Sequence, residues 1–153
     1  MKLSKFCGEE LIRLELQSES KDEAIRELVN LAARSKLVRD EKELLSAVLE
    51  REKLVTTGVG YGVAFPHAKT KATRGVVIAF GRSKNGIDFE AMDKKPVYLF
   101  FLIAAPEDAI GAHLNVMAQL SFIMKDEKNR KRFAEVKSPG EVLEALDKAA
   151  ETT

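Results

Sequence analysis

Residues 58–67 read GVGYGVAFPH, and this stretch decides how the middle of the chain folds. Three glycines alternate with larger residues, and glycine adopts the positive φ values that tight turns need. An apolar run then ends at Pro66, whose ring fixes its own φ and keeps Phe65 out of the helical conformation. The stretch therefore predicts a turn, followed by a stiff strand end that presents His67.

The composition indicates one globular domain over residues 1–153. Hydrophobic residues make up 45% of the chain and charged residues 32%, which allows a core and excludes a disordered chain. The formal net charge is only +1, so the bulk charge attracts neither nucleic acid nor an anionic membrane. Any function that depends on charge must therefore arise from a local cluster.

The single cysteine, Cys7, cannot form an intrachain disulfide, and we interpret it as a small apolar residue. The first residues lack the apolar segment of a signal peptide. The longest apolar run, 97–105, has the length of a strand and not of a membrane span. These features predict a soluble protein of the cytoplasm that does not insert into the membrane.

Before the glycine stretch, the pattern predicts one strand and two helices. Apolar and polar residues alternate over 12–16, as in a half-buried strand. Ser20 and Asp40 are N-cap residues for two amphipathic segments, which end near Arg34 and near Glu52.

After the glycine stretch, the chain returns to strands and then ends in helices. The run 75–81 predicts a buried strand, Asn85 and Gly86 predict a turn, and 97–103 predicts a central strand. Helical patterns follow over 112–125 and 126–136, and again from the N-cap Ser138. The expected fold is an α/β (α+β) sandwich with a mixed sheet of about four to five strands and helices on both faces.

Several groups that favour an anion surround His67 in this scheme. The amides of Gly58 and Gly60 can form an anion-binding concavity. Arg51 ends the preceding helix, so the chain can turn back and place its guanidinium beside the glycines. His113 starts a later helix, where free amides can face an anion. The sequence thus predicts two imidazoles, a guanidinium and free N–H groups in one site.

Other chemistries lack their motifs. Two histidines and one distant cysteine fall short of a zinc site. The glycines fit neither a Walker A loop nor GxGxxG before a helix, and no G-x-S-x-G elbow exists. What remains is nucleophilic catalysis by histidine itself, because neutral imidazole is a good nucleophile near pH 7. A transferred phosphoryl group would need the positive donors around it.

Each candidate also has a purely structural interpretation. His113 could cap its helix, and Arg51 could form an ion pair at a helix end, where cations are stabilising in any case. Thr56 and Thr57 could donate their hydroxyls to a phosphate or could merely cap a turn. Tyr61 could belong to a docking surface or could simply pack.

The motifs resemble those of a known family. Arg51 and Glu52, followed by TTGVGYGVAFPHAKT at 56–70, resemble the EIIA components of the bacterial sugar phosphotransferase system, in the fructose/mannitol/nitrogen class. The segments GIDF at 86–89 and 97–105, and the pair His113-Leu114, extend the resemblance over about residues 3–148. Phe65 stands where the family usually has isoleucine.

The resemblance implies a phosphocarrier with a mixed sheet between helices and with no metal or organic cofactor. It places the phosphorylated histidine on His67, which would take the group from HPr on Nε2 and pass it to a cysteine of an EIIB domain. It makes His113 a contact of the phosphoryl oxygens and Arg51 a charge partner, and we expect His67 to be exposed in a shallow depression. A nitrogen-type regulator that signals through phosphorylation-dependent protein binding is the alternative.

Overall fold

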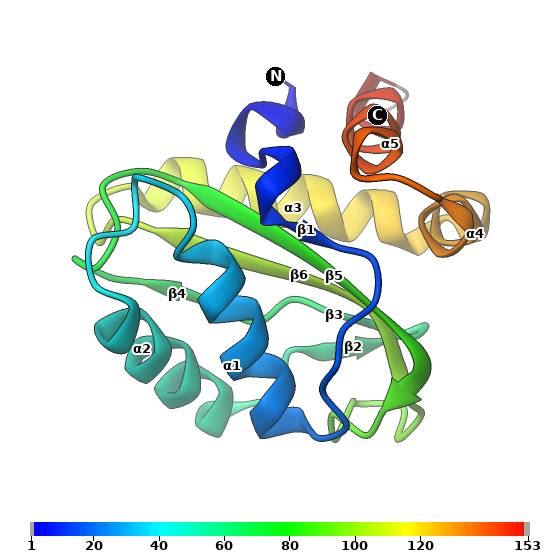
Figure 1. Cartoon of the computed structure of the whole chain (residues 1–153), viewed down its shortest axis with the longest axis horizontal. Helices are drawn as coiled ribbons and strands as arrows, with labels where there is room; N and C mark the ends of the chain where they lie inside the picture. The colour runs from blue at the N-terminus through cyan, green and yellow to red at the C-terminus, as the bar shows by residue number, and fades with distance from the viewer. Residues whose placement is uncertain (1, 152–153) are drawn as a thin grey trace.

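A mixed β-sheet forms the centre of the computed structural model, which describes residues 2–151 (Figure 1). Within these residues the sheet has six strands, in the order β1-β5-β6-β3-β2, with β4 also paired to β6. The prediction of four to five strands was slightly low, because the chain from 58 to 69 divides into three short strands. The strands are β1 (Ile12–Arg13), β2 (Gly58–Gly60), β3 (Val63–Ala64), β4 (His67–Lys69), β5 (Val77–Ile87) and β6 (Val97–Ala105).

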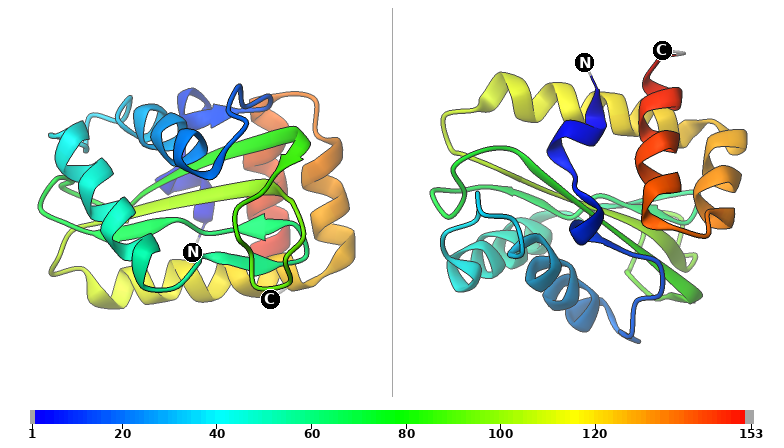
Figure 2. Two further views of the ribbon diagram at one scale, coloured as in Figure 1. Left: turned by 90° about the horizontal axis from the view of Figure 1, so that it is seen from below. Right: turned by 45° about the horizontal axis from the view of Figure 1, so that its top comes forward.

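Helices cover both faces of the sheet, as predicted. Figures 1 and 2 show α1 (Lys21–Ala32) and α2 (Glu41–Leu54) on one face. The other face carries α3 (Ile110–Lys125), α4 (Glu127–Glu135), α5 (Pro139–Glu151) and the short 3-10 helices η1 (Leu3–Phe6) and η2 (Glu9–Leu11).

The predicted helix starts are confirmed by their caps. Ser20, Asp40 and Ser138 each accept a hydrogen bond from the backbone N–H three residues later, at 3.3, 3.0 and 3.3 Å. These caps satisfy amides that have no partner within the helix.

Two local predictions were wrong. The strand predicted over 12–16 is limited to Ile12–Arg13, because the chain then leaves the sheet and only the Leu16 N–H returns to it, donating to the Arg82 carbonyl at 2.8 Å. Asn85 and Gly86 do not end a strand but lie inside β5, where the register with β6 shifts. Gly86 has φ of 83°, and a bulge absorbs the turn that this dipeptide usually makes.

Cys7 lies between η1 and η2 and is buried in the core, as its interpretation as a small apolar residue requires. Burial, followed by the charge of Glu10, raises the pKa of its thiol to about 12. A thiol with so high a pKa is almost entirely protonated at neutral pH and is therefore a poor nucleophile.

A cluster of phenylalanines around Phe101 of β6 supports the segment that leads to His67. The ring of Phe101 lies 5.0 Å from Phe80, 5.5 Å from Phe133 and 5.8 Å from Phe65, centroid to centroid. All four side chains are buried. The position of Phe65, two residues before His67, therefore depends on packing against the central strand.

We predict that Phe101→Ala lowers the free energy of unfolding by about 3–5 kcal/mol, because it leaves a cavity between β6 and α4. Phe122→Ala is the matched control, since that ring on α3 is 60% exposed. Urea denaturation should show a change within about 0.5 kcal/mol for this control. Equal effects of the two substitutions would contradict the packing role of Phe101.

Candidate functional site

His67 opens β4 at the edge of the sheet, where the backbone is held against β6. It pairs with Ile103 of β6, and the carbonyl of Pro66 accepts the Ile103 N–H at 3.0 Å. The side chain is half-buried, so it is less exposed than the resemblance suggested. Proline and the strand ladder together leave this backbone little freedom.

The Nδ1 atom of His67 lies 2.8 Å from the carbonyl oxygen of Phe65. A carbonyl only accepts hydrogen bonds, so this contact requires a proton on Nδ1. In the neutral ring the proton is then absent from Nε2, which keeps its lone pair. The arrangement therefore leaves Nε2 as the nucleophilic atom.

The imidazole of His113 comes from α3 to lie against His67, with ring centroids 5.3 Å apart. His113 is 5% exposed, and its Nε2 is buried without a hydrogen-bond partner among the described residues. The backbone N–H of His113 donates to the Ala109 carbonyl within the helix. The part of His113 that faces His67 is its side chain. A buried polar atom without a partner is unusual and indicates a place where a ligand atom can bind.

Arg51 lies in the last turn of α2, on the opposite face of the sheet from α3. Its Nη1 donates to the Val55 carbonyl at 2.9 Å, and no carboxylate pairs with it within residues 2–151. Its charge nevertheless acts on His67. The two helices thus bring Arg51 and His113 to β4 from opposite faces, as the sequence predicted for these three residues.

Burial is the largest cause that lowers the pKa of His67. The hydrogen bond to Phe65 raises this pKa, Arg51 lowers it, Glu52 raises it and Lys69 lowers it, with a net decrease. Because the pKa falls below its ordinary value of about 6.5, the ring is neutral at pH 7.

His113 is also neutral at pH 7. Burial, followed by the charges of His67 and Lys69, lowers its pKa to about 4. A neutral ring with a proton on Nε2 can donate a hydrogen bond to an anion without first losing or gaining a proton.

The threonines and the first glycine of the stretch are engaged within the fold. Thr57 donates its N–H and its hydroxyl to the carboxylate of Glu52, at 2.8 and 2.5 Å. Thr56 donates its hydroxyl to the Phe89 carbonyl at 3.3 Å, and its Oγ1 accepts the Gly58 N–H at 3.1 Å. This geometry gives no support to the expectation that these groups bind a phosphate.

Gly60 lies far from the imidazoles. It pairs with Val63, which is opposite Leu99 on β6, whereas His67 is opposite Ile103. Four residues of a strand span about 13 Å. The structure therefore does not bring Gly60 next to His67, and its amide cannot contact a group on that ring.

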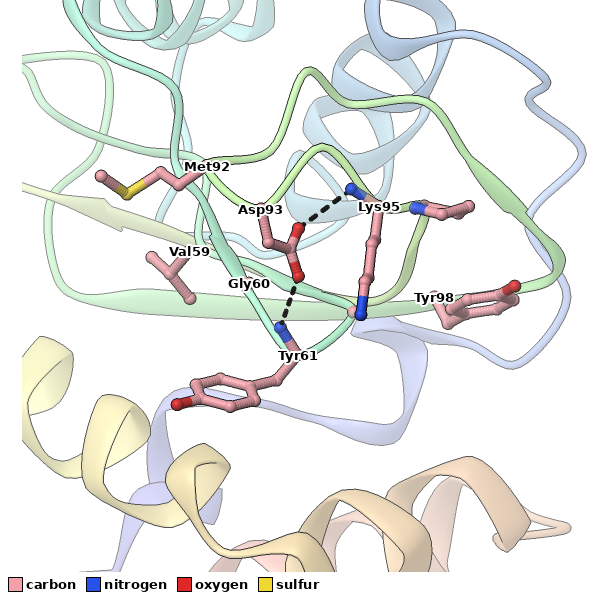
Figure 3. A pocket seen from close by; sticks show the side chains of 9 residues that line it. Val59, Gly60, Tyr61, Met92, Asp93, Lys95 and Tyr98 are labelled. Carbon is pink, nitrogen blue, oxygen red and sulfur yellow. Dashed lines mark hydrogen bonds between the residues drawn. The ribbon is translucent and has the colours of Figure 1, made fainter.

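The tip of the β2–β3 hairpin borders a different depression, shown in Figure 3. There the carboxylate of Asp93 accepts the N–H of Tyr61 at 3.3 Å and the N–H of Lys95 at 3.0 Å. Tyr61 itself is exposed, with φ of 59°. The hairpin is thus fastened to the 88–96 loop rather than to the histidines.

Sequence reasoning assigned no role to two residues that act on the imidazoles, Lys69 and Glu52. Side chains two residues apart on a strand share a face, so the strand pattern could have indicated Lys69 beside His67. No local pattern reveals Glu52, because its contacts with Thr57 and Lys21 form only when α2 packs in place.

Within residues 2–151, no three side chains of histidine, cysteine, aspartate or glutamate gather as metal ligands. In the same range, no helix combines the length and apolar character that crossing a membrane requires.

Comparison with known proteins identifies relatives over nearly the whole chain. The family model "Phosphoenolpyruvate-dependent sugar phosphotransferase system, EIIA 2" matches residues 5–149. The chain is 42% identical to the fructose-specific EIIA component of Haloferax volcanii over 142 residues, covering 93% of this chain and 92% of the relative. It is 35% identical to the fructose-specific EIIABC component of Bacillus subtilis, covering 96% of this chain but 23% of that longer protein.

Solved structures with the same fold include a nitrogen regulatory protein and a mannitol enzyme IIA. The nitrogen regulatory protein IIA-Ntr from Neisseria meningitidis superposes with a TM-score of 0.87 at 31% identity, covering 94% of this chain and 98% of that one. The mannitol enzyme IIA of Escherichia coli, solved in complex with phosphorylated enzyme IIB, gives a TM-score of 0.77 at 30% identity, covering 91% and 95%.

We predict that both histidines titrate below their ordinary pKa of about 6.5. The pKa of His113 should be about 4. NMR of the ring protons against pH measures both values, and the urea-unfolded chain is the control. Because the unfolded rings bind protons at higher pH, these two groups make the fold less stable as pH falls from 6.5 towards 4. A pKa of His113 at or above 6.5 would contradict the described environment.

Proposed function

The chain belongs to the EIIA 2 family of the phosphoenolpyruvate-dependent sugar phosphotransferase system, and we propose that it carries a phosphoryl group on Nε2 of His67 between two protein partners. The observation that carries this proposal is the hydrogen bond from Nδ1 to the Phe65 carbonyl. It leaves Nε2 unprotonated beside the unpartnered Nε2 of His113.

In the first step, the Nε2 lone pair of His67 attacks the phosphorus of the phosphorylated carrier HPr. A new N–P bond forms, and the bond to the donor breaks with its electron pair remaining on the donor. The ring becomes positively charged, and its Nδ1–H continues to donate to Phe65, which stabilises that charge. The Pro66 backbone keeps Nε2 in place during this exchange.

His113 and Arg51 act on the oxygens of the moving phosphoryl group. Negative charge spreads over three equatorial oxygens in the transition state. The neutral His113 ring donates through Nε2–H, which lacks another partner among the described residues, and the Arg51 guanidinium supplies positive charge. Loss of one such donor typically costs about 3 kcal/mol of barrier.

In the second step, a cysteine thiolate of an EIIB partner attacks the phosphorus, and His67 recovers its lone pair. The mannitol enzyme IIA of Escherichia coli, solved with phosphorylated enzyme IIB, supports this choice of partner. We expect this transfer to take place in the cytoplasm, because its donor is itself phosphorylated from phosphoenolpyruvate.

Exposed apolar side chains next to the site suit such brief encounters. Leu54 and Val55 follow Arg51, while Ile110 and Leu114 flank His113 on α3, and all four are exposed. One modest apolar face around His67 can then serve both partners in turn.

A regulatory role through the same histidine is the second candidate, favoured by the similarity to IIA-Ntr of Neisseria meningitidis. Mixing the phosphorylated protein with purified EIIB domains separates the two. Transfer to an EIIB cysteine supports sugar uptake, whereas failure with every fructose- and mannitol-type EIIB supports regulation.

We predict that His67→Gln abolishes phosphoryl uptake, whereas His113→Gln slows it about a hundredfold without preventing it. Intact mass is measured after incubation with phosphoenolpyruvate, enzyme I and HPr. The wild-type adduct should be labile in acid and stable in base, as a phosphoramidate is. An adduct of the same stability on His67→Gln would refute the assignment of the acceptor.

Arg51→Lys should slow uptake at least tenfold, because an ammonium does not reproduce the planar guanidinium fork. Arg34→Lys is the matched control, since Arg34 is exposed just beyond α1. The same mass assay, sampled over time, gives both rates. Equal rates for the two variants would reduce Arg51 to a structural cation at the end of α2.

A further inference from the structure

Glu52 occupies an unfavourable position for a carboxylate. It lies in the last turn of α2, where the helix dipole is negative and disfavours an anion. Its side chain is nonetheless buried, with 7% of the residue exposed. A buried charge in such a place is retained only where hydrogen bonds and an opposite charge offset its cost.

Both oxygens of Glu52 are engaged. Oε2 accepts the Thr57 N–H at 2.8 Å and lies 3.0 Å from Nζ of Lys21 on α1. Oε1 accepts the Thr57 hydroxyl at 2.5 Å. The carboxylate therefore binds Thr57 through two donors, and the two hydrogen bonds fix both the position and the orientation of Thr57.

Two more hydrogen bonds connect Thr57 to the imidazole of His67. The Thr57 carbonyl accepts the Phe65 N–H at 3.0 Å. The Phe65 carbonyl accepts Nδ1–H of His67 at 2.8 Å. The backbone of Phe65 is thus held at its N–H by the Thr57 segment, while its carbonyl holds the ring of His67.

We propose that Glu52 is a positioning residue for His67, which acts through Thr57 and Phe65 to keep the proton on Nδ1 and the lone pair on Nε2. The consequence for transfer rests on the proposed function, whereas the hydrogen-bond relay does not. Without the hydrogen bonds from Thr57 to Glu52, the Phe65 carbonyl would be free to shift. The ring of His67 could then adopt its other tautomer or turn away.

The charges around His67 give Glu52 a second effect. Arg51 and Glu52 face the ring from α2, Lys69 from β4, and the neutral His113 from α3. Glu52 is the anion in this set and opposes the two cations. Removing its charge lowers the pKa of His67 further.

A purely structural role predicts something different. If Glu52 only ties α2 and α1 to the sheet, its removal lowers the free energy of unfolding but leaves the tautomer of the folded protein unchanged. The tautomer of His67 in the folded protein therefore separates the two explanations, whereas its pKa responds to the charge of Glu52 in either case.

The test compares Glu52→Gln and Thr57→Val with the wild type, by ¹⁵N NMR of the histidine rings and by the rate of phosphoryl uptake. Both variants should raise the population of the tautomer protonated at Nε2 and slow uptake about ten- to a hundredfold. Glu52→Gln should also lower the pKa of His67. Thr57→Ser keeps the hydroxyl and should restore wild-type values, and Glu50→Gln, an exposed carboxylate on the same helix, is the matched control.

A folded Glu52→Gln protein with the wild-type tautomer of His67 would overturn the proposal, whatever its pKa. If that variant does not fold, Thr57→Val against Thr57→Ser decides by the same tautomer measurement. Failure of the proposed function is distinct, because it would appear as a wild-type protein that takes up no phosphoryl group. The NMR measurements on the unphosphorylated protein do not depend on that result.

Discussion

The hydrogen bond between Nδ1 of His67 and the Phe65 carbonyl is the constraint on which the site depends. It is a contact between neighbours in the chain, and it forms because Pro66 keeps the backbone between them extended. The surrounding fold serves to hold that short segment still. Phe65 packs on Phe101, and the Pro66 carbonyl is anchored to Ile103. The imidazole is thereby oriented by a backbone carbonyl and by the core, and not by a direct hydrogen bond to a carboxylate.

The position of β4 at the edge of the sheet explains how side chains from two helices can reach His67. β4 pairs with β6 on one side, so α2 and α3 can approach it from the two faces of the sheet. Two imidazoles at 5.3 Å would repel each other if both were charged, and their lowered pKa values remove that conflict. The same burial that keeps them neutral leaves Nε2 of His113 without a partner, which costs stability but prepares a donor for an anion.

Sequence reasoning succeeded where a feature depends on neighbouring residues. The caps at Ser20, Asp40 and Ser138 are local, and so is the strand end at Pro66. It failed at Asn85 and Gly86, because residues 83–86 form a bulge within β5, between the pairs Arg82–Leu99 and Ile87–Val97. It also missed Glu52, whose partners are Lys21 on α1 and Thr57 just before β2. The meeting of His67 with His113 was expected from the chemistry of an anion site and from the resemblance, since no local pattern links β4 to α3.

The glycine stretch has a meaning that its composition did not suggest. A Cβ on Gly58 would lie 2.9 Å from the backbone of Ala91, so glycine here permits a close approach of two chain segments. Gly60 has φ of 105°, a conformation that side chains disfavour, and it lets the hairpin turn. The turn then sets where β3 begins along β6, and the fixed number of residues from β3 to β4 places His67 opposite Ile103. Gly60 thus acts on the position of His67 through the register of the sheet, and not through direct contact with the imidazole.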